Sequence, residues 1–340
     1  MTKVITFGEV MLKLSSLSYQ RFIQSSAMNV EYAGAEANVA VSLSNFGVKT
    51  EFVSKLPKNE LGETALNRLR QFGVDVSGIA RGGERIGIYF VEKGASQRPS
   101  KVIYDRTHSA IAEAQKFDFD WDIIFQDANW FHFTGITPAL SDAVAEICLD
   151  ACKAAKERNI TISCDLNYRN KLWPREKAKL VMTGLCKYVD VCIANEEDAA
   201  NVFGIEAKNS DVNEGALDVH SYEAVASQLQ SRFGFKLVAI TLRESLSASD
   251  NNWSAILYDG EKTYVSRKYG IHIIDRIGGG DAFGAGLIYG CIQGFDKQKA
   301  LDFAVAASCL KQTIEGDFNL VSVSEVEHLM SSAGSGRIVR

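Results

Sequence analysis

The sequence predicts an α/β protein in three layers, α/β/α, with a mainly parallel sheet covered by helices on both faces. Two observations lead to this fold class. From residue 130 onwards, short apolar strands alternate with helical segments, an order that brings successive strands side by side through helical crossovers. The composition, 46% hydrophobic and 23% charged over 340 residues, allows a large core and excludes a disordered chain. We expect one domain over residues 1–340.

The N-terminal part is expected to supply strands of the main sheet and a small lid. Its first elements are a strand interrupted at Gly8 (3–14), a helix stopped by Gly47 (33–47), a strand (50–55) and a helix (61–72). Residues 85–104 then alternate between apolar and polar side chains on either side of a polar loop. Two exposed strands around such a loop are typical of a flap, so we expect a lid here.

The C-terminal part shows the strand–helix alternation most clearly. Expected strands lie at 130–135, 160–165, 189–194 and 237–242, and the helices between them at 141–159, 176–187, 196–203 and 222–234. Ser141 is a plausible N-cap for the first of these helices. A hairpin (254–258 and 263–266), a long helix from Gly278 and two closing helices (297–314 and 324–332) complete the prediction, with a frayed tail at 333–340.

The charge balance and the cysteines limit the partners and the compartment. Lys and Arg total 37 against 42 acidic residues, a formal charge of −5, so we expect no nucleic-acid partner. The seven cysteines contain no Cys-x-x-Cys pair, which favours buried, reduced thiols. Neither a signal peptide nor an apolar run of membrane-spanning length is visible. We therefore expect a cytoplasmic protein with no membrane partner.

Several common site motifs are missing. The sequence has no Gly-Lys dipeptide for a Walker P-loop and no G-x-G-x-x-G for a Rossmann dinucleotide site. It also lacks the G-x-S-x-G and H-E-x-x-H patterns of many hydrolases and zinc proteases. Any phosphate chemistry must therefore use another loop.

The glycine-rich stretch from Asp275 to Ile288 is the most informative segment. Gly278, Gly279 and Gly280 allow a tight turn that directs several backbone N–H groups into one pocket, and the following helix adds its positive end. Asp281 beside such an anion site fits the role of a base that accepts the proton of an attacking hydroxyl. The alternative is an ordinary loop in which Asp281 is the helix N-cap.

This segment resembles the second signature of the ribokinase-like (PfkB) carbohydrate kinase family. The family's first signature has a counterpart in Ala33-Gly-Ala-Glu-Ala-Asn-Val-Ala40, with Gly47 and Gly62 at suitable distances. Glu36 and the pair Arg276-Ile277 depart from the general pattern, and with Gly-Gly-Gly-Asp they resemble the 2-keto-3-deoxygluconate kinase branch. The resemblance covers nearly the whole chain, and it implies a ribokinase-like fold with a small β-strand lid from about 8–32 and 85–106.

The resemblance also implies a role for each site residue. Asp281 becomes the general base, and Gly278, Gly279 and Gly280 form the anion hole. The substrate residues are Gly34, Asn38, Tyr89, Tyr104, Arg106, Arg169 and Asp317. The nucleotide residues are Asn167, Asn195, Thr241, Arg243 and Ser245, with Gly278 and Gly280. Asp198, in Asn195-Glu-Glu-Asp198, stands where the family has Glu, so it would contact a magnesium ion only indirectly.

Two arginines point to the class of substrate. An Arg fork binds a carboxylate in bidentate fashion, which a neutral hexose cannot reciprocate. Arg169 comes directly after a predicted strand, where sites of α/β proteins gather, whereas the alternative for Arg106 and Arg169 is ordinary surface charge. In Tyr104-Asp105-Arg106, the aspartate is a further departure from the branch, and Gly34 is expected to let a sugar approach the backbone.

The implied function is ATP- and Mg²⁺-dependent phosphorylation of the terminal hydroxyl of 2-keto-3-deoxygluconate to give 2-keto-3-deoxy-6-phosphogluconate. Two alternatives remain: a kinase of a neutral sugar such as fructose or ribose, and a non-catalytic sugar-acid sensor on the same fold. The lid would exclude water from the site. Exposed lid strands also favour pairing with a second copy, so we expect a homo-oligomer.

Overall fold

The computed structural model describes residues 2–207 and 218–332. Its main sheet has the strand order β13-β12-β11-β10-β9-β8-β1-β4-β5, and β14 pairs with β12. The pairs from β5 to β11 are parallel, whereas β12 pairs antiparallel with β11, β13 and β14. The bounds are β1 (Lys3–Phe7), β4 (Lys49–Leu56), β5 (Ile79–Arg81), β8 (Ala128–Thr134), β9 (Thr161–Asp165), β10 (Val191–Ala194), β11 (Leu237–Ser245), β12 (Asp250–Tyr258), β13 (Thr263–Val265) and β14 (Tyr269–His272).

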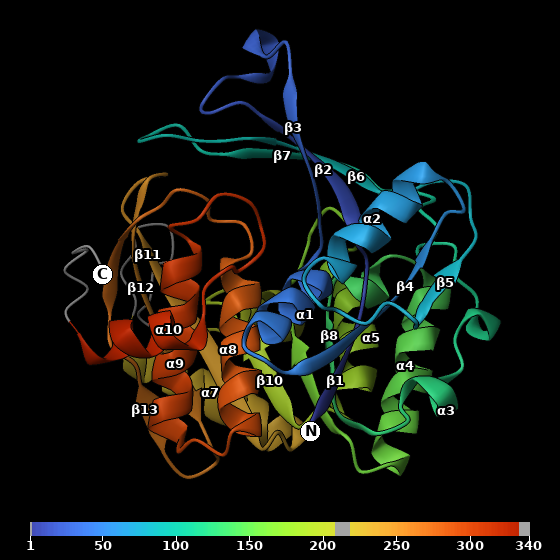
Figure 1. Ribbon diagram of the computed structural model, residues 1–340. Coiled ribbons are helices and arrows are strands. Elements are labelled where there is room, and N and C mark those ends of the chain that lie inside the picture. Colours follow the sequence, from blue (N-terminus) through green and yellow to red (C-terminus); the bar gives the residue numbers. More distant parts are fainter. Residues whose placement is uncertain (1, 208–217, 333–340) are drawn as a thin grey trace.

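Helices cover both faces of this sheet (Figure 1). They are α1 (Ala35–Asn45), α2 (Glu60–Arg70), α3 (Trp121–Ile124), α4 (Asp142–Glu157), α5 (Arg175–Cys186), α6 (Asp198–Phe203), α7 (Val219–Phe233), α8 (Gly279–Ile292), α9 (Lys297–Lys311) and α10 (Val323–Ser331). Short 3₁₀ turns lie at Phe22–Gln24, Lys116–Asp118 and Thr137–Ala139.

Strand alternation divides the core into two apolar layers. Val4 of β1 belongs to the apolar cluster that includes residues of α1, α8, α9 and α10, whereas its neighbour Ile5 belongs to the cluster that includes residues of α4, α5, α6 and α7. Successive side chains of a strand point to opposite faces, so a strand covered on both faces is apolar throughout. This accounts for the continuous apolar runs in the sequence, and the predicted α/β/α class is confirmed.

The apolar layer that contains Ile5 buries most of the free thiols. Five of the seven cysteines lie in the core between the sheet and helices α4 and α5: Cys148, Cys152, Cys164, Cys186 and Cys192. Burial raises the pKa of each of these thiols, because a thiolate is poorly solvated in an apolar core.

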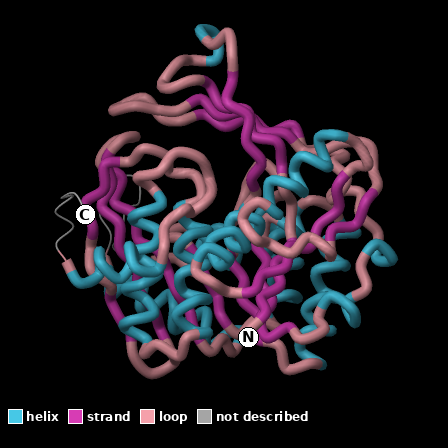
Figure 2. Tube along the Cα trace, in the orientation of Figure 1, coloured by secondary structure: helices cyan, strands magenta, loops and turns pink. Residues whose placement is uncertain are grey.

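A second, smaller sheet stands above the body as a lid (Figure 2). Its order is β3-β2-β6-β7, with the bounds β2 (Met11–Ser16), β3 (Met28–Ala33), β6 (Ile88–Glu92) and β7 (Lys101–Asp105). Because β1 and β2 are joined only by residues 8–10, the chain passes directly from the core of the body into the lid.

The lid presents two chemically different faces, because paired residues on neighbouring strands share a face. The pairing places Val30, Leu14, Phe90 and Ile103 in one apolar row. The neighbouring row consists of Glu31, Lys13, Tyr89 and Tyr104, and Tyr89 and Tyr104 line a cavity under the lid.

Most elements lie where the sequence pattern predicts them. Ser141 is the N-cap of α4 and accepts a hydrogen bond from the Val144 N–H, as expected. The pattern does not predict α3, β5 or β14, because three or four residues are too few to show a period. The tail at 333–340 lies outside the described residues.

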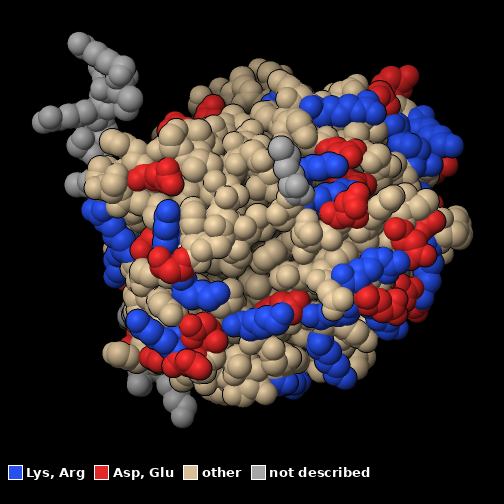
Figure 3. Space-filling view, turned by 60° about the horizontal axis from the view of Figure 1, so that its bottom comes forward, with Lys and Arg blue, Asp and Glu red and all other residues tan. Residues whose placement is uncertain are grey.

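The surface turned away from the lid carries mixed charge. Figure 3 shows basic and acidic side chains interspersed on this face, the usual pattern of a solvated surface. Within residues 2–207 and 218–332, no helix combines the length and the apolar character needed to cross a membrane.

Two substitutions of glycine by alanine, one at the contact of α8 with α9 and one in α5, test how closely α8 must approach α9. A Cβ at Gly286 would lie 2.7 Å from the Cα of Ala304, so Gly286→Ala should lower the free energy of unfolding by about 1–3 kcal/mol. Gly184 in α5 has no such neighbour within 4 Å, and Gly184→Ala should instead add about 0.5–1 kcal/mol. Urea unfolding measures both, and equal effects would contradict the packing argument.

Candidate active site

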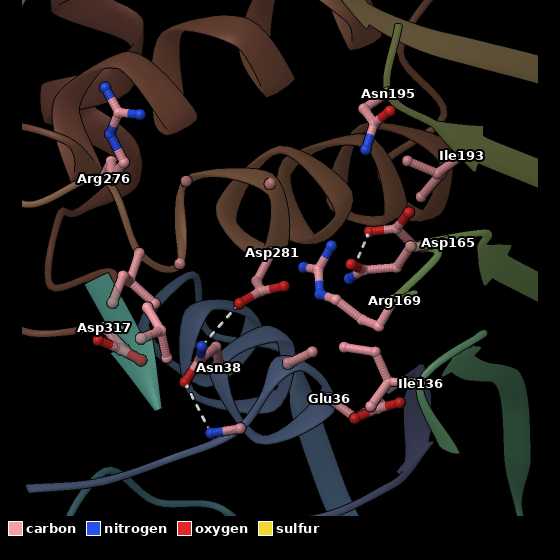
Figure 4. A pocket seen from close by; sticks show the side chains of 18 of the residues that line it. Glu36, Asn38, Ile136, Asp165, Arg169, Ile193, Asn195, Arg276, Asp281 and Asp317 are labelled. Atoms are coloured by element: carbon pink, nitrogen blue, oxygen red, sulfur yellow. Dashed lines mark hydrogen bonds between the residues drawn. The ribbon is translucent and has the colours of Figure 1, made fainter. Parts of the chain in front are cut away.

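A cavity of about 360 Å³ lies between the lid and the carboxyl ends of the central strands. Its walls come from the lid, from the N-terminal turn of α1, from the ends of β9, β10 and β11, and from the loop before α8 (Figure 4). The carboxyl ends of parallel strands are where open α/β sheets bind ligands. Every site residue expected from the sequence lines this cavity except Ser245 and Asp198.

The glycine loop opens α8 at the floor of the cavity. Gly278 is the N-cap with a left-handed φ of 81°, and a Cβ there would lie 2.0 Å from the backbone oxygen of Asp317. Only glycine fits this position. A Cβ at Gly280 would meet no atom within 4 Å, so the N-terminal end of α8 is open towards the cavity. The N–H of Gly279 donates to the backbone oxygen of Arg276 at 3.3 Å, and the other first N–H groups of α8, together with the helix dipole, suit an anion.

Asp281 lies in the first turn of α8 but does not cap it. The cap is Gly278, and the carboxylate of Asp281 instead accepts a hydrogen bond of 2.6 Å from Asn38 Nδ2. The alternative that Asp281 is the N-cap is therefore wrong. Burial raises the pKa of Asp281 to about 7, although the bond from Asn38 favours the ionised form. A carboxyl with such a pKa can exchange a proton near neutral pH.

Arg169 and Asp165 lie beside Asp281. Figure 4 shows the guanidinium of Arg169 between the two carboxylates. Burial raises the pKa of Asp165 well above its usual value, the charges of Asp198 and Asp281 raise it further, and Arg169 opposes this. The only hydrogen bond from a described side chain to the Asp165 carboxylate is a weak one of 3.4 Å from Asn167 Nδ2.

Arg106 is a buried residue, not a surface charge. Its Nε and Nη2 both donate to Glu9 Oε2, and Ser109 Oγ donates to Glu9 Oε1 at 2.6 Å. The guanidinium carbon lies 5.5 Å from the ring centre of Tyr104. Nη1 is the nitrogen left without a hydrogen bond to any described residue, so Glu9 fixes the orientation of the fork before a ligand arrives.

Tyr89, Tyr104 and Asp317 form the wall under the lid. The two tyrosine rings stack with centroids 6.0 Å apart. Tyr89 donates to Asp317 Oδ2 at 2.6 Å, and Lys13 Nζ donates to Asp317 Oδ1 at 2.6 Å. The carboxylate of Asp317 is thus already engaged by two lid residues.

Gly34 lines the cavity, as expected, and a second steric constraint acts on it. A Cβ at Gly34 would lie 1.8 Å from the backbone oxygen of Glu9. The connection into the lid occupies the space beside this residue, so that contact alone requires a glycine.

The opposite side of the cavity is basic and polar. Arg243 forms long ion-pair contacts of 3.3–3.4 Å with Glu196, and Thr241 and Asn195 lie next to it on the lining. Arg276 donates to the backbone oxygen of Ala248 at 3.3 Å, while its buried Nε has no partner among the described residues. Burial lowers the pKa of Arg276, as does the charge of Arg243.

Two expected residues do not line the cavity: the nucleotide residue Ser245 and Asp198, for which an indirect magnesium contact is expected. Ser245 is an exposed residue at the end of β11. Asp198 is buried, and its carboxylate accepts the backbone N–H groups of Tyr168 and Asn195, each at 2.9 Å. These bonds attach Asp198 to the loops around the site.

The sequence pattern did not predict that Glu36 would connect α1 to the end of β8 and the loop after it by buried hydrogen bonds. Its Oε1 accepts from the Thr134 backbone N–H at 3.0 Å, from Thr134 Oγ1 at 2.7 Å and from Thr137 Oγ1 at 2.5 Å. Burial raises the pKa of Glu36. A Cβ at Gly8, directly after β1, would lie 2.1 Å from Glu36 Oε2, so the Glu36 side chain occupies the space beside this glycine. The signal was present, because Glu36 departs from the family pattern.

An anion site at a helix N-terminus, a carboxylate beside it and a lid over both define a small-molecule phosphotransferase. The comparisons agree: the chain belongs to the pfkB family of carbohydrate kinases, whose model matches residues 1–320.

Similar proteins extend over almost the whole chain. A solved 2-dehydro-3-deoxygluconokinase from Thermotoga maritima is 51% identical, with a TM-score of 0.93 over 97% of this chain and 98% of its own. A 2-dehydro-3-deoxygalactonokinase from Haloferax volcanii is 32% identical over 98% of both chains. A 2-dehydro-3-deoxygluconokinase from Bacillus subtilis is 28% identical over 93% of this chain and 91% of its own. The predicted family and the ribokinase-like fold class are confirmed.

The raised pKa of Asp281 predicts an acidic limb in the pH profile. If Asp281 acts as a base, only its ionised form is active, so kcat/KM should fall about tenfold per pH unit below a pKa of about 7. Asn38→Ala removes a donor that favours ionisation, and it should move this limb to higher pH. Initial rates from pH 5 to 9 test both. A limb in Asn38→Ala that stayed in place or moved to lower pH would contradict the assignment.

Proposed function

We propose that this kinase transfers a phosphoryl group from ATP to the terminal hydroxyl of 2-keto-3-deoxygluconate, also called 2-dehydro-3-deoxygluconate. The observation that carries the proposal is the placement of Arg169 and Arg106 on the same cavity as Asp281. A sugar acid offers both a carboxylate, which an arginine can bind, and a hydroxyl, which the base can deprotonate. The names of the relatives from Thermotoga maritima and Bacillus subtilis support the same substrate class.

Asp281 is the proposed general base. It accepts the proton of the terminal hydroxyl as that oxygen bonds to phosphorus and the bond from phosphorus to the leaving oxygen breaks. The amides of Gly278, Gly279 and Gly280 stabilise the charge that develops on the phosphoryl oxygens. Asn38 holds the carboxylate of Asp281 in place at 2.6 Å.

The polar side of the cavity suits a polyphosphate and Mg²⁺. ATP supplies the phosphoryl group, and Mg²⁺ neutralises charge on its phosphates. Arg276 has a buried Nε without a partner in the described chain, and Gly280 leaves open space above α8, so an anion fits here. Arg243, Thr241, Asn195 and Asn167 would line it. No cluster of three or more His, Cys, Asp or Glu ligands exists within the described residues, and Mg²⁺ commonly uses one or two carboxylates with substrate phosphates.

The 4-epimer 2-keto-3-deoxygalactonate is a second candidate substrate. The relative from Haloferax volcanii carries the corresponding name, and the two acids share the carboxylate and the terminal hydroxyl. A neutral sugar is less compatible with the site, because it has no carboxylate to offer to Arg169. A coupled assay of ADP formation with both acids, fructose and ribose separates these substrates.

We also infer that the protein is a cytoplasmic homo-oligomer that associates through its lid. β3 and β7 are edge strands of the lid, and the apolar row on one face includes Val30 and Ile103, exposed to 63% and 53%. Open edges and exposed apolar side chains favour pairing with a second copy. Sedimentation equilibrium of the intact protein tests this, and a monomer at micromolar concentration would contradict it.

Replacing the base should abolish most turnover. Asp281→Asn keeps the shape of the side chain but removes the proton acceptor, so kcat should fall by at least about a hundredfold. The sugar acid and ATP should still bind, as calorimetry would show. Asp296→Asn makes the same change at the N-cap of α9 and should leave kcat unchanged. Near-normal turnover in Asp281→Asn would contradict the assignment of Asp281 as the general base.

Arg169 should control substrate class. Arg169→Ala removes charge-assisted hydrogen bonds of about 1.5–3 kcal/mol, so kcat/KM for the keto-acid should fall roughly ten- to a hundredfold or more. Arg169→Lys should restore only part of this, because it lacks the planar fork. Weak activity on a neutral ketose should change little.

The control is Arg175→Ala on α5, whose guanidinium binds Asn201 and does not line the cavity. It should leave both substrates unaffected. Equal losses on the acid and the ketose in Arg169→Ala would assign Arg169 to ATP or to the fold, and the sugar-acid proposal would lose its support.

A further inference from the structure

Lys13, on the central lid strand β2, is fully buried and is not part of the cavity wall. Its ammonium lies 2.6 Å from Asp317 Oδ1, 2.9 Å from Glu31 Oε2 and 3.6 Å from Asp275 Oδ2. Glu31 is its cross-strand neighbour within the lid, whereas Asp275 and Asp317 belong to the body. One lysine therefore joins the lid to two separate segments beneath it.

Both body carboxylates lie next to the glycine loop, and Asp317 also lines the cavity. Asp275 lies three residues before Gly278, and its own carboxylate accepts the backbone N–H groups of Ile277 at 3.2 Å and Gly316 at 3.3 Å. The backbone oxygen of Asp317 packs against Gly278 so closely that no side chain fits. A shift of Asp275 or Asp317 would therefore move the glycine loop.

The body holds these segments less strongly without the lid. Lys311, at the end of α9, donates to the backbone oxygen of Asp275 at 3.1 Å, and Ser308 Oγ donates to the Gly279 oxygen at 2.7 Å. No described body side chain donates to the carboxylate of Asp317, whose hydrogen-bond donors are Lys13 and Tyr89 of the lid. Opening of the lid would thus remove both hydrogen-bond donors from the carboxylate of Asp317.

The charge of Lys13 suits a reversible contact. Burial alone would lower the pKa of its ammonium, but Asp317, Asp275 and Glu31 together raise it above the usual value. When the lid opens, water can solvate the separated charges, so opening does not leave a charge buried and unpaired. Lys93 adds an outer contact of the same kind, 3.0 Å from Glu315 and 3.7 Å from Asp275.

We propose that Lys13 is a positioning residue that ties the closed lid to the anion hole, so that the amides of Gly278–Gly280 reach their working geometry only under a closed lid. The inference rests on the proposed phosphoryl transfer at this loop. Its consequence is coupling: transfer to the sugar occurs when water is excluded, and an open lid leaves the loop misplaced and the site wet.

The experiment compares Lys13→Met, which keeps the aliphatic stem, with wild type. Because a misplacement of about 1 Å in a catalytic geometry can cost about a hundredfold, kcat should fall roughly ten- to a hundredfold. In parallel, the ratio of ADP formed to sugar phosphorylated should rise above one, since water gains access to the phosphoryl group. A residue with a merely structural role would lower stability without changing this ratio.

Lys3→Met is the matched control. Lys3 forms a buried ion pair with Glu51 at 2.6 Å, at the edge of the body away from the lid. The Lys3→Met variant should lose thermal stability but still form one ADP per phosphorylated sugar. If Lys13→Met loses stability but keeps wild-type kcat and stoichiometry, the proposal is overturned.

A double variant guards against misfolding. Lys13→Met leaves buried carboxylates unpaired, whereas Lys13→Met with Asp317→Asn removes a positive and a negative charge together and should fold more readily. This double variant should also form more ADP than phosphorylated sugar. A ratio of one ADP per phosphorylated sugar in this variant would overturn the proposal. Wild type that phosphorylated a different sugar would refute the proposed substrate alone, because the ADP ratio can be measured with any acceptor.

Discussion

Negative charge must be brought together at the N-terminal end of α8, and this requirement shapes much of the molecule. Asp281, Asp165 and a bound phosphate would repel one another strongly in a cavity with little water. The structure offsets the repulsion with the helix end, the Asn38 amide and the guanidinium of Arg169. Burial is the main cause of the raised pKa of Asp281, and the charges of Asp317 and Glu36 raise it further, whereas Asn38 and Arg169 oppose the shift. A lid that excludes water strengthens each of these interactions, so the lid belongs to the electrostatics of the site as much as to its shape.

The large features of the fold follow from local sequence. Strands covered on both faces have to be apolar throughout, and the glycines at 278–280 allow a turn that almost no other residues permit. For this reason the three layers, the tight turn at 278–280 and the position of Asp281 at the cavity could be predicted without coordinates. The candidate nucleotide side was predicted less well, because a residue at the end of β11 can point either way, and Ser245 points out.

What the sequence could not show are the contacts between distant segments. Arg106 and Glu9 are separated by 97 positions, and Lys13 and Asp317 by 304. No periodicity or motif connects such pairs, and a buried arginine looks the same in sequence as a surface one. Gly34 illustrates the same limit: its motif is visible, but the reason for the glycine is the carbonyl of Glu9, which only the folded chain brings to it.

Five buried cysteines lie in one layer of the body, so a thiol reagent can distinguish the opening of that layer from movements elsewhere. Cys148, Cys152, Cys164, Cys186 and Cys192 all lie in the layer between the sheet and helices α4 and α5, far along the chain from any lid strand. An alkylating reagent reacts with the exposed thiolate, so these positions become labelled only when that layer opens. Their labelling rate would therefore report the opening of this half of the body and remain insensitive to movement of the lid.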